Sequence, residues 1–310
     1  MTNVNGIAPV VITPSILAAS LGRSLSADQA SMATLENQVA TGRAVAKPSD
    51  NPAQASNILL LQSALTRAKQ YASNAQDGVG WLTLGNGTMN SIMNVLQRVQ
   101  SALVGLTGDV TAGTAGVTTG VATTVSDARQ ELINLANTQY AGQAIFAGTG
   151  TPRIAYNATG TYVGAGVAPT RTVAPGTRVA VAVTGPEVFG PTGATSLLGK
   201  TGILATIAAQ ITSGTVAQIN KAATTGLAAL QSAMANVEAQ AGRLGADQQS
   251  MEGFASQATA SVAALSTELQ GAQDVTLGEA TTNLQALQTS YQAALYVLSQ
   301  VHTDSLLQYL

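Results

Sequence analysis

Side chains able to perform catalysis are few and scattered in this sequence. The 310 residues include one histidine, His302, and no cysteine. A Ser-His-Asp triad would have to use His302, and thiolate or multi-histidine metal sites are excluded. The 15 acidic residues are spread thinly, with no close pair of the kind that performs acid–base catalysis. The sequence therefore predicts a protein that is not an enzyme, with no catalytic, cofactor-binding or metal-binding residues.

Two short features that could be taken for chemical motifs are better explained by helices. His302 follows Val301, which continues a helical spacing of apolar residues, so we interpret it as a residue on a helix face. Gly85-Asn86-Gly87 follows no predicted strand and precedes no Gly-Lys-Ser or Gly-Lys-Thr, so it does not predict a phosphate-binding loop.

The composition favours association with other proteins. Charged residues make up 9% of the chain and aromatic residues 4%, whereas about a quarter of an ordinary soluble protein is charged. A net charge of −2 creates no field that would gather nucleic acid or anionic lipid. No apolar stretch approaches the roughly 20 residues that span a bilayer. We expect neither nucleic-acid binding nor membrane insertion.

The dominant pattern is a heptad spacing of apolar residues, with steps of three and four. A sustained spacing of 3.5 residues keeps one apolar stripe along a helix and makes helices wrap around each other. We call these positions seam residues. Two long inner segments carry the pattern, at 58–103 and 227–272. Two outer segments carry it at Leu21, Leu25, Met32, Leu35 and Val39, and at Leu284, Leu287, Tyr291, Leu298 and Val301.

The pattern predicts a mainly α fold: a long antiparallel helical rod or coiled coil built from both chain ends, with a small inserted β domain at its tip. Inner seams are equally compatible with an intramolecular bundle and with assembly. For the outer seams we favour association between subunits, although the two outer helices could also pair with each other. The predicted parts are a leader (1–14), an N-terminal axial helix (15–45), a first half of the rod (46–150), the β domain (151–198), a second half of the rod (199–272) and a C-terminal axial helix (273–310).

Specific residues explain the breaks between the predicted helices. Gly42 suits a left-handed cap that ends the first helix, and Asn51 followed by Pro52 suits the start of the second. The intervening loop holds Arg43, Lys47 and Asp50. A solvated loop is the simplest interpretation of these charges, and contact with a neighbouring subunit is the alternative.

The inserted segment changes to an alternating pattern. Residues 171–173, 178–183 and 187–189 are predicted to be short strands between Pro-Gly and Gly-Pro turns, and residues 161–163 are a further candidate. At the N-terminus, Pro9 and Pro14 bracket a short apolar run that lacks the basic region of a secretory signal. The protein is therefore expected in the cytoplasm or exported without a cleaved signal.

Several of these segments resemble the flagellin class of bacterial flagellar axial proteins. The resemblance lies in residues 35–43 (Leu-Glu-Asn-Gln-Val-Ala-Thr-Gly-Arg), 47–53 (Lys-Pro-Ser-Asp-Asn-Pro-Ala) and 241–246 (Ala-Gly-Arg-Leu-Gly-Ala). Within the class, the chain is most similar to the hook-associated members that join hook to filament. That closer similarity lies in residues 137–149, 171–189, 291–295 and 305–310. One departure is the proline-containing leader before the first helix.

The resemblance implies a structural subunit of the flagellum at the hook–filament junction, secreted through the type III export apparatus with the help of a chaperone. It implies self-assembly through both chain ends, with hook-associated protein 1 on one side and flagellin on the other. Two alternatives stay open: a flagellin-like filament subunit, and a secreted coiled-coil effector.

Overall fold

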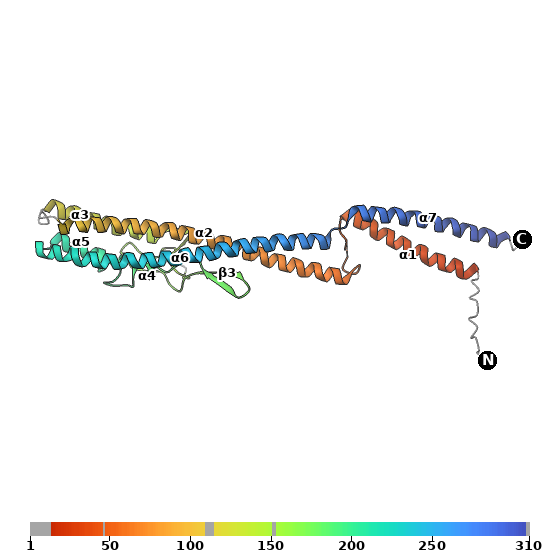
Figure 1. The fold of residues 1–310 in the computed structure, drawn as a ribbon. Coiled ribbons are helices and arrows are strands. Elements are labelled where there is room, and N and C mark those ends of the chain that lie inside the picture. The colour runs from red at the N-terminus through yellow and green to blue at the C-terminus, as the bar shows by residue number, and fades with distance from the viewer. Residues whose placement is uncertain (1–13, 46, 109–114, 151–152, 308–310) are drawn as a thin grey trace, which may run out of the picture. The chain divides into compact units, whose positions relative to one another are not determined.

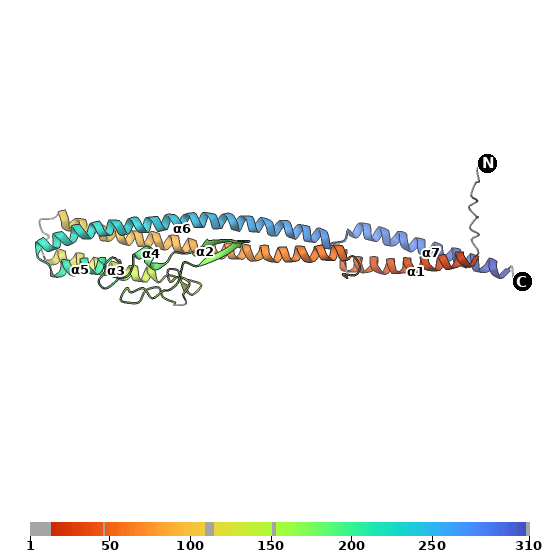
Figure 2. The same ribbon diagram turned by 90° about the horizontal axis from the view of Figure 1, so that it is seen from below.

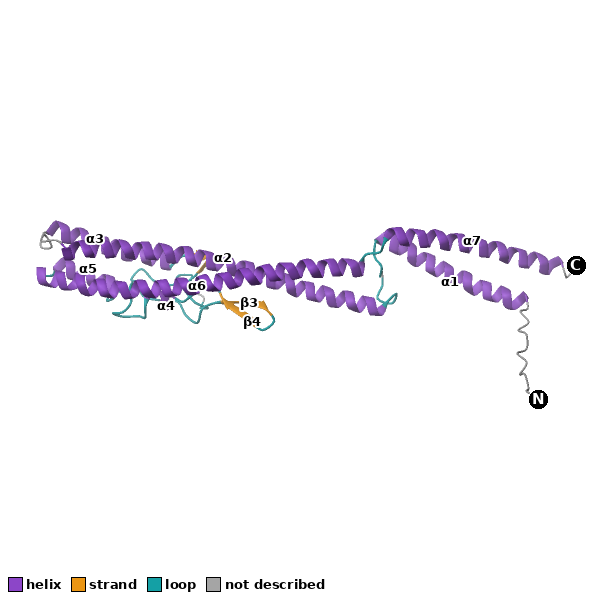
Figure 3. Cartoon of the chain, viewed as in Figure 1, coloured by secondary structure: helices purple, strands orange, loops and turns teal. Residues whose placement is uncertain are grey.

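The computed structural model describes residues 14–45, 47–108, 115–150 and 153–307 (Figures 1 and 3). Most of the predicted leader, 1–14, lies outside these residues. The described helices are α1 (Pro14–Thr41), α2 (Pro52–Gly108), α3 (Ala115–Ala136), α4 (Gly185–Phe189), α5 (Ile203–Ser213), α6 (Val216–Gln273) and α7 (Leu277–Leu307). Helices α2 and α6, of 57 and 58 residues, are each about 85 Å long at 1.5 Å per residue. None of the described helices is long and apolar enough to cross a membrane.

The chain forms two compact units. The terminal unit comprises residues 1–65 and 263–310, and the central unit comprises residues 66–262. Helices α2 and α6 contribute to both units, because each division falls inside a helix.

In the terminal unit, α1 and α7 lie side by side and run in opposite directions (Figures 1 and 2). The segment that follows α1 also pairs with the segment that precedes α7. Ala44 N donates to Gln273 O at 2.7 Å, and Val275 N donates to Gly42 O at 3.0 Å. These two hydrogen bonds hold the segment after α1 against the segment before α7.

In the central unit, α2 and α6 lie side by side in both views of the ribbon (Figures 1 and 2). Their seam residues are all buried or half-buried, which confirms the heptad register. The most deeply buried of them include Leu82, Met89 and Leu96 on α2 and Leu244 and Met251 on α6, each at 0 or 1% exposed. Helices α3 and α5 pack on each other and add their own apolar faces to the same core.

The inserted segment is less regular than the alternating pattern predicts. Strands β3 (Thr170–Ala174) and β4 (Thr177–Ala180) form an antiparallel hairpin, as expected for residues 171–173 and the first part of 178–183. A second hairpin, before the inserted segment, consists of β1 (Gln139–Tyr140) and β2 (Gln143–Ala144). Around residues 161–163 the structure has one isolated bridge, between Tyr156 and Tyr162.

The strand predicted at residues 187–189 is wrong, because these residues lie in α4. The Glu187 carboxylate accepts a hydrogen bond from Thr184 N at 2.7 Å, which is half of a capping box. Pro186 lies in the first turn, where a missing N–H costs no helical hydrogen bond. Local capping therefore outweighs the alternating pattern here.

The inserted segment also lies elsewhere than predicted. It packs against the sides of α2 and α6 rather than beyond their ends (Figure 2). Asn74 on α2 donates to Thr172 O at 2.8 Å, and Asn236 on α6 donates to Glu187 O at 2.7 Å. Phe189 of the insert meets Phe146, which precedes the insert, edge to face with ring centroids 5.8 Å apart. A segment of this size cannot bury enough apolar surface alone, and the helices supply the remainder.

Candidate assembly interface

The structure brings the two outer sets of seam residues together between α1 and α7. Leu25 is buried, at 8% exposed. The other described seam side chains are half-buried: Leu21, Met32, Leu35 and Val39 on α1, and Leu284, Leu287, Tyr291 and Leu298 on α7. Val301 lies in α7, and its side chain is outside the described residues. Within one chain, the seam thus joins the first helix to the last.

A polar contact accompanies this apolar seam. The side-chain amide of Gln29 donates to the Tyr291 hydroxyl at 2.6 Å, linking residues that are 262 positions apart. Tyr291 can do this because its ring lies in the seam while its hydroxyl reaches the edge. The contact fixes the position of α1 along α7 more specifically than apolar packing alone.

The ends of the helices are capped as predicted. Gly42 has φ +69°, a left-handed conformation that favours glycine, and its N–H donates to Gln38 O at 2.8 Å. The Asn51 side chain accepts from Gln54 N at 3.0 Å, as an N-cap does. The Gln54 side chain in turn donates to Ala272 O at 2.9 Å. The start of α2 is therefore tied to the end of α6 within the terminal unit.

The three charged loop residues lie on the surface of the terminal unit. Arg43, Lys47 and Asp50 are all exposed. The Asp50 carboxylate accepts a hydrogen bond from Lys47 N at 2.8 Å, which closes the turn before α2. Arg43 and Lys47 also line a hollow of about 190 Å³, together with Val45, Pro48, Ile58 and Leu59. A role of these charges in contact between subunits remains a prediction.

Sequence reasoning missed a second set of apolar residues, which are exposed on the terminal unit. Large apolar side chains away from the seam are 43–67% exposed: Ile16, Leu59, Leu60, Leu277, Leu295, Tyr296 and Val297. A pair of helices can bury only the faces that they turn to each other, so these residues stay at the surface. Consecutive apolar residues such as 58–61 and 295–298 were the available signal, since only some of them can lie in one seam. The exposed residues are distributed over α1, α2 and α7.

The described residues contain no group of three or more histidine, aspartate or glutamate side chains that could hold a metal ion. What this arrangement offers is exposed apolar side chains on α1, α2 and α7.

Both ends of the chain match known family models. Residues 12–151 match the bacterial flagellin N-terminal helical region, and residues 227–310 match the bacterial flagellin C-terminal helical region. Together these ranges include α1, α2, α3, α7 and most of α6. The chain belongs to the flagellin family.

Within the flagellin family, two curated relatives are similar in sequence. The chain is 30% identical over 163 residues to flagellar hook-associated protein 3 of Salmonella typhimurium, covering 52% of this chain and 51% of that protein. It is 26% identical over 169 residues to flagellar hook-associated protein 3 of Escherichia coli, covering 54% and 53%. The chain thus matches about half the length of each relative.

Two solved structures have the same fold. A flagellar hook-associated protein from Vibrio parahaemolyticus superposes with a TM-score of 0.62 at 19% identity, over 73% of this chain and 100% of that one. FlgL from Bacillus cereus superposes with a TM-score of 0.54 at 18% identity, over 68% and 99%. The mainly α flagellin-like fold with a small strand-containing insert is therefore shared with these proteins.

Proposed function

We propose that this protein is a structural subunit of the bacterial flagellum that joins hook to filament. The proposal rests on one observation above all: the first and last helices pair with each other and leave a second set of large apolar side chains at the surface. The similarity to two proteins named hook-associated protein 3 supports the junction rather than the filament. The role is mechanical, and no substrate is involved.

Assembly would use the exposed apolar residues of the terminal unit. Tyr296, Leu60 and Leu59 are each more than 60% exposed. Burying one large apolar side chain contributes about 1.5–3 kcal/mol, so a few such contacts would offset the cost of ordering chain ends. The seam between α1 and α7 would then hold both helices in place for the contact with neighbouring copies.

The proposed partners follow from the position at the junction. Copies of this chain would form a ring or helical layer, with hook-associated protein 1 on the hook side and flagellin on the filament side. The subunit would be secreted through the flagellar type III apparatus. A chaperone would cover the C-terminal helix in the cytoplasm, since α7 without α1 exposes its seam.

Electron microscopy of cells that lack this gene tests the proposal. We expect hooks without filaments, with flagellin lost to the medium, and restored filaments when the wild-type gene is supplied. Hooks that carry normal or altered filaments would contradict a junction role and favour a flagellin-like filament subunit.

A secreted coiled-coil effector is distinguished by a second variant. Removing residues 284–310 takes away the C-terminal seam and should abolish filament attachment. An effector would keep its activity toward its target after this truncation, and motility would be unchanged.

A further inference from the structure

The long seam between α2 and α6 contains one polar pair. The side-chain amide of Asn86 donates to the carbonyl oxygen of the Gln248 side chain at 2.6 Å. Gln248 in turn donates to the Glu252 carboxylate at 2.9 Å. Both Asn86 and Gln248 occupy seam positions of the heptad pattern and are half-buried.

The pair stands between apolar layers. On α2, the neighbouring seam residues are Leu82 and Met89; on α6, they are Leu244 and Met251, and all four are at 0 or 1% exposed. The half-buried amides are therefore partly shielded from water by these neighbours. Either amide left without its partner would be costly.

Apolar packing alone specifies the register of these helices weakly. Many seam positions hold alanine, including Ala68, Ala72 and Ala75 on α2 and Ala255 and Ala258 on α6. Small, similar side chains repeat every seven residues, so a shift of one heptad exchanges one apolar contact for another. Few charged residues flank the seam to oppose this shift.

Such a shift would break the hydrogen bond between Asn86 and Gln248. Displacing α6 by seven residues places Asn86 opposite Ala255 in one direction and opposite Ala241 in the other. Gln248 then lies opposite Met93 or Val79, whose side chains donate no hydrogen bond to its carbonyl oxygen. A single polar pair in a coiled coil is known to select register in this way.

We propose that Asn86 and Gln248 are the residues that set the register of α2 against α6. The inserted segment also links these helices, through Asn74 and Asn236. That link needs the insert to be folded, whereas the amide pair needs only the two helices. The pair therefore acts while the chain is folding, and it does so whichever position in the flagellum the protein occupies.

Cysteine cross-linking can report the register, because the chain has no cysteine of its own. A Cβ atom at Gly78 would lie 3.2 Å from Cγ of Met251, so Gly78→Cys with Met251→Cys reports the native register. Gly78→Cys with Ala258→Cys, or with Leu244→Cys, reports a shift of one heptad in either direction. Full-length protein is diluted from urea into oxidising buffer, and cross-linked species are separated on a gel.

With both amides present, we expect cross-linking of the native pair and only traces of the shifted pairs. Replacing both amides by leucine (Asn86→Leu with Gln248→Leu) keeps the seam apolar, so the helices still form. The shifted cross-links should then increase about tenfold, in line with the loss of one partly buried hydrogen bond. Circular dichroism checks that helix content is unchanged.

Two further variants sharpen the test. Exchanging the residues, Asn86→Gln with Gln248→Asn, keeps two amides and should restore the native cross-link. Asn90→Leu changes an exposed residue of the same helix and should leave the register unchanged. Native cross-linking alone in the double leucine variant would overturn the proposal, and so would shifted cross-links in the exchanged variant.

Discussion

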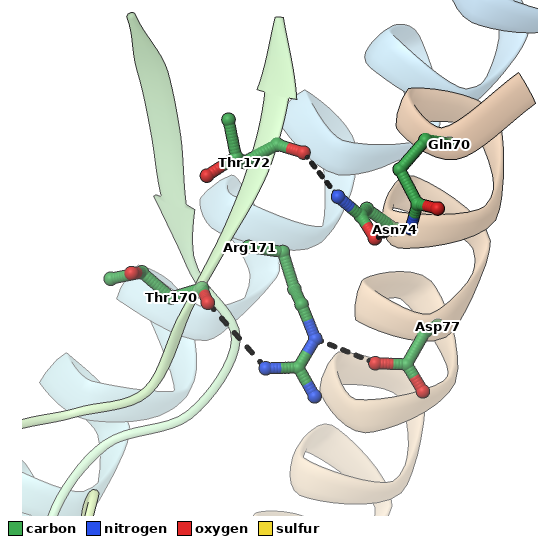
Figure 4. Close-up of polar contacts among 6 residues, drawn as sticks. All are labelled: Gln70, Asn74, Asp77, Thr170, Arg171 and Thr172. Carbon is green, nitrogen blue, oxygen red and sulfur yellow. Dashed lines mark hydrogen bonds and ion pairs between the residues drawn. The ribbon is translucent and has the colours of Figure 1, made fainter. Parts of the chain in front are cut away.

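The Nε atom of Arg171 lies 2.7 Å from Oδ2 of Asp77, an ion pair that joins the β3–β4 hairpin to α2 (Figure 4). The same guanidinium lies 5.7 Å from the centroid of the Trp81 ring. Beside it, the Asn74 side chain donates to Thr172 O. Three contacts of different kinds thus hold one edge of the hairpin on the helix.

The ion pair should contribute modestly to stability. The side chains of Arg171 and Asp77 are 30% and 39% exposed, so water screens their attraction. We expect Asp77→Asn to lower the free energy of unfolding by about 0.5–1 kcal/mol, since the pair is only partly shielded. Urea unfolding followed by circular dichroism measures this. Glu131→Gln is the control, because the Arg98–Glu131 pair is about half exposed on both sides and should contribute less. A loss no larger than that of the control would contradict the prediction.

The hydrogen bonds of Asn137 should contribute more to the stability of the fold than any of the exposed ion pairs. Its side-chain oxygen accepts from Ala155 N at 2.8 Å and from Tyr156 N at 2.9 Å, and its amide donates to Tyr156 O at 2.8 Å. Asn137→Ala would leave these backbone groups without a partner, at a cost of about 1–3 kcal/mol.

Thermal unfolding and limited proteolysis test the Asn137 prediction. Because the lost contacts hold residues 155–156, protease cleavage in the inserted segment should accelerate before the helices are affected. Asn90→Ala, at an exposed position of α2, is the matched control and should leave both measurements unchanged. Equal cleavage rates in the two variants would show that the Asn137 contacts do not hold the insert.

Tyr156 should make the protein less stable in alkali. Burial raises the pKa of its hydroxyl, and the nearby Tyr162 adds to the shift. Burial and Glu187 likewise raise the pKa of Tyr162. A raised pKa means that the folded protein keeps its phenol protons where the unfolded chain loses them. Stability is then unaffected below pH 10, the ordinary pKa of tyrosine, and falls as the pH rises above it.

Tyr156→Phe removes the part of this alkaline sensitivity that comes from Tyr156. The Tyr156 hydroxyl is buried and has no hydrogen-bond partner among the described residues, so its removal should not lower stability at pH 7. Above pH 10, the variant should lose less stability than the wild type. Urea unfolding at pH 7 and at about pH 11 gives both values. A loss of stability at pH 7 would reveal a partner for this hydroxyl.

Heptad spacing predicts the helical part of this fold well. Every seam residue named on α2 and α6 is buried or half-buried, because a spacing of 3.5 residues determines which side of a helix faces its partner. The caps at Gly42 and Asn51 were also predictable, since they depend on interactions within a few residues.

Features that depend on distant packing were harder to predict. The division between α5 and α6 was missed, although Thr215 and Gln218 form half of a capping box there, with Thr215 N donating to Oε1 of Gln218 at 2.7 Å. The position of the insert was wrong, because contacts such as Arg171–Asp77 join residues 94 positions apart. No local pattern specifies such a pairing.

Leu298 gives the most direct test of the terminal helices. It is a half-buried seam residue of α7. Leu298→Asp places a charge in an apolar seam, which is strongly unfavourable without a partner. We expect this variant to be absent from assembled flagella while the helices of the central unit stay folded, since residue 298 lies in the other unit. Leu298→Met keeps the apolar volume and should be incorporated normally.

Immunogold labelling of isolated flagella measures incorporation, and circular dichroism measures helix content. Incorporation of Leu298→Asp at the level of Leu298→Met would mean that assembly does not depend on the pairing of α1 with α7.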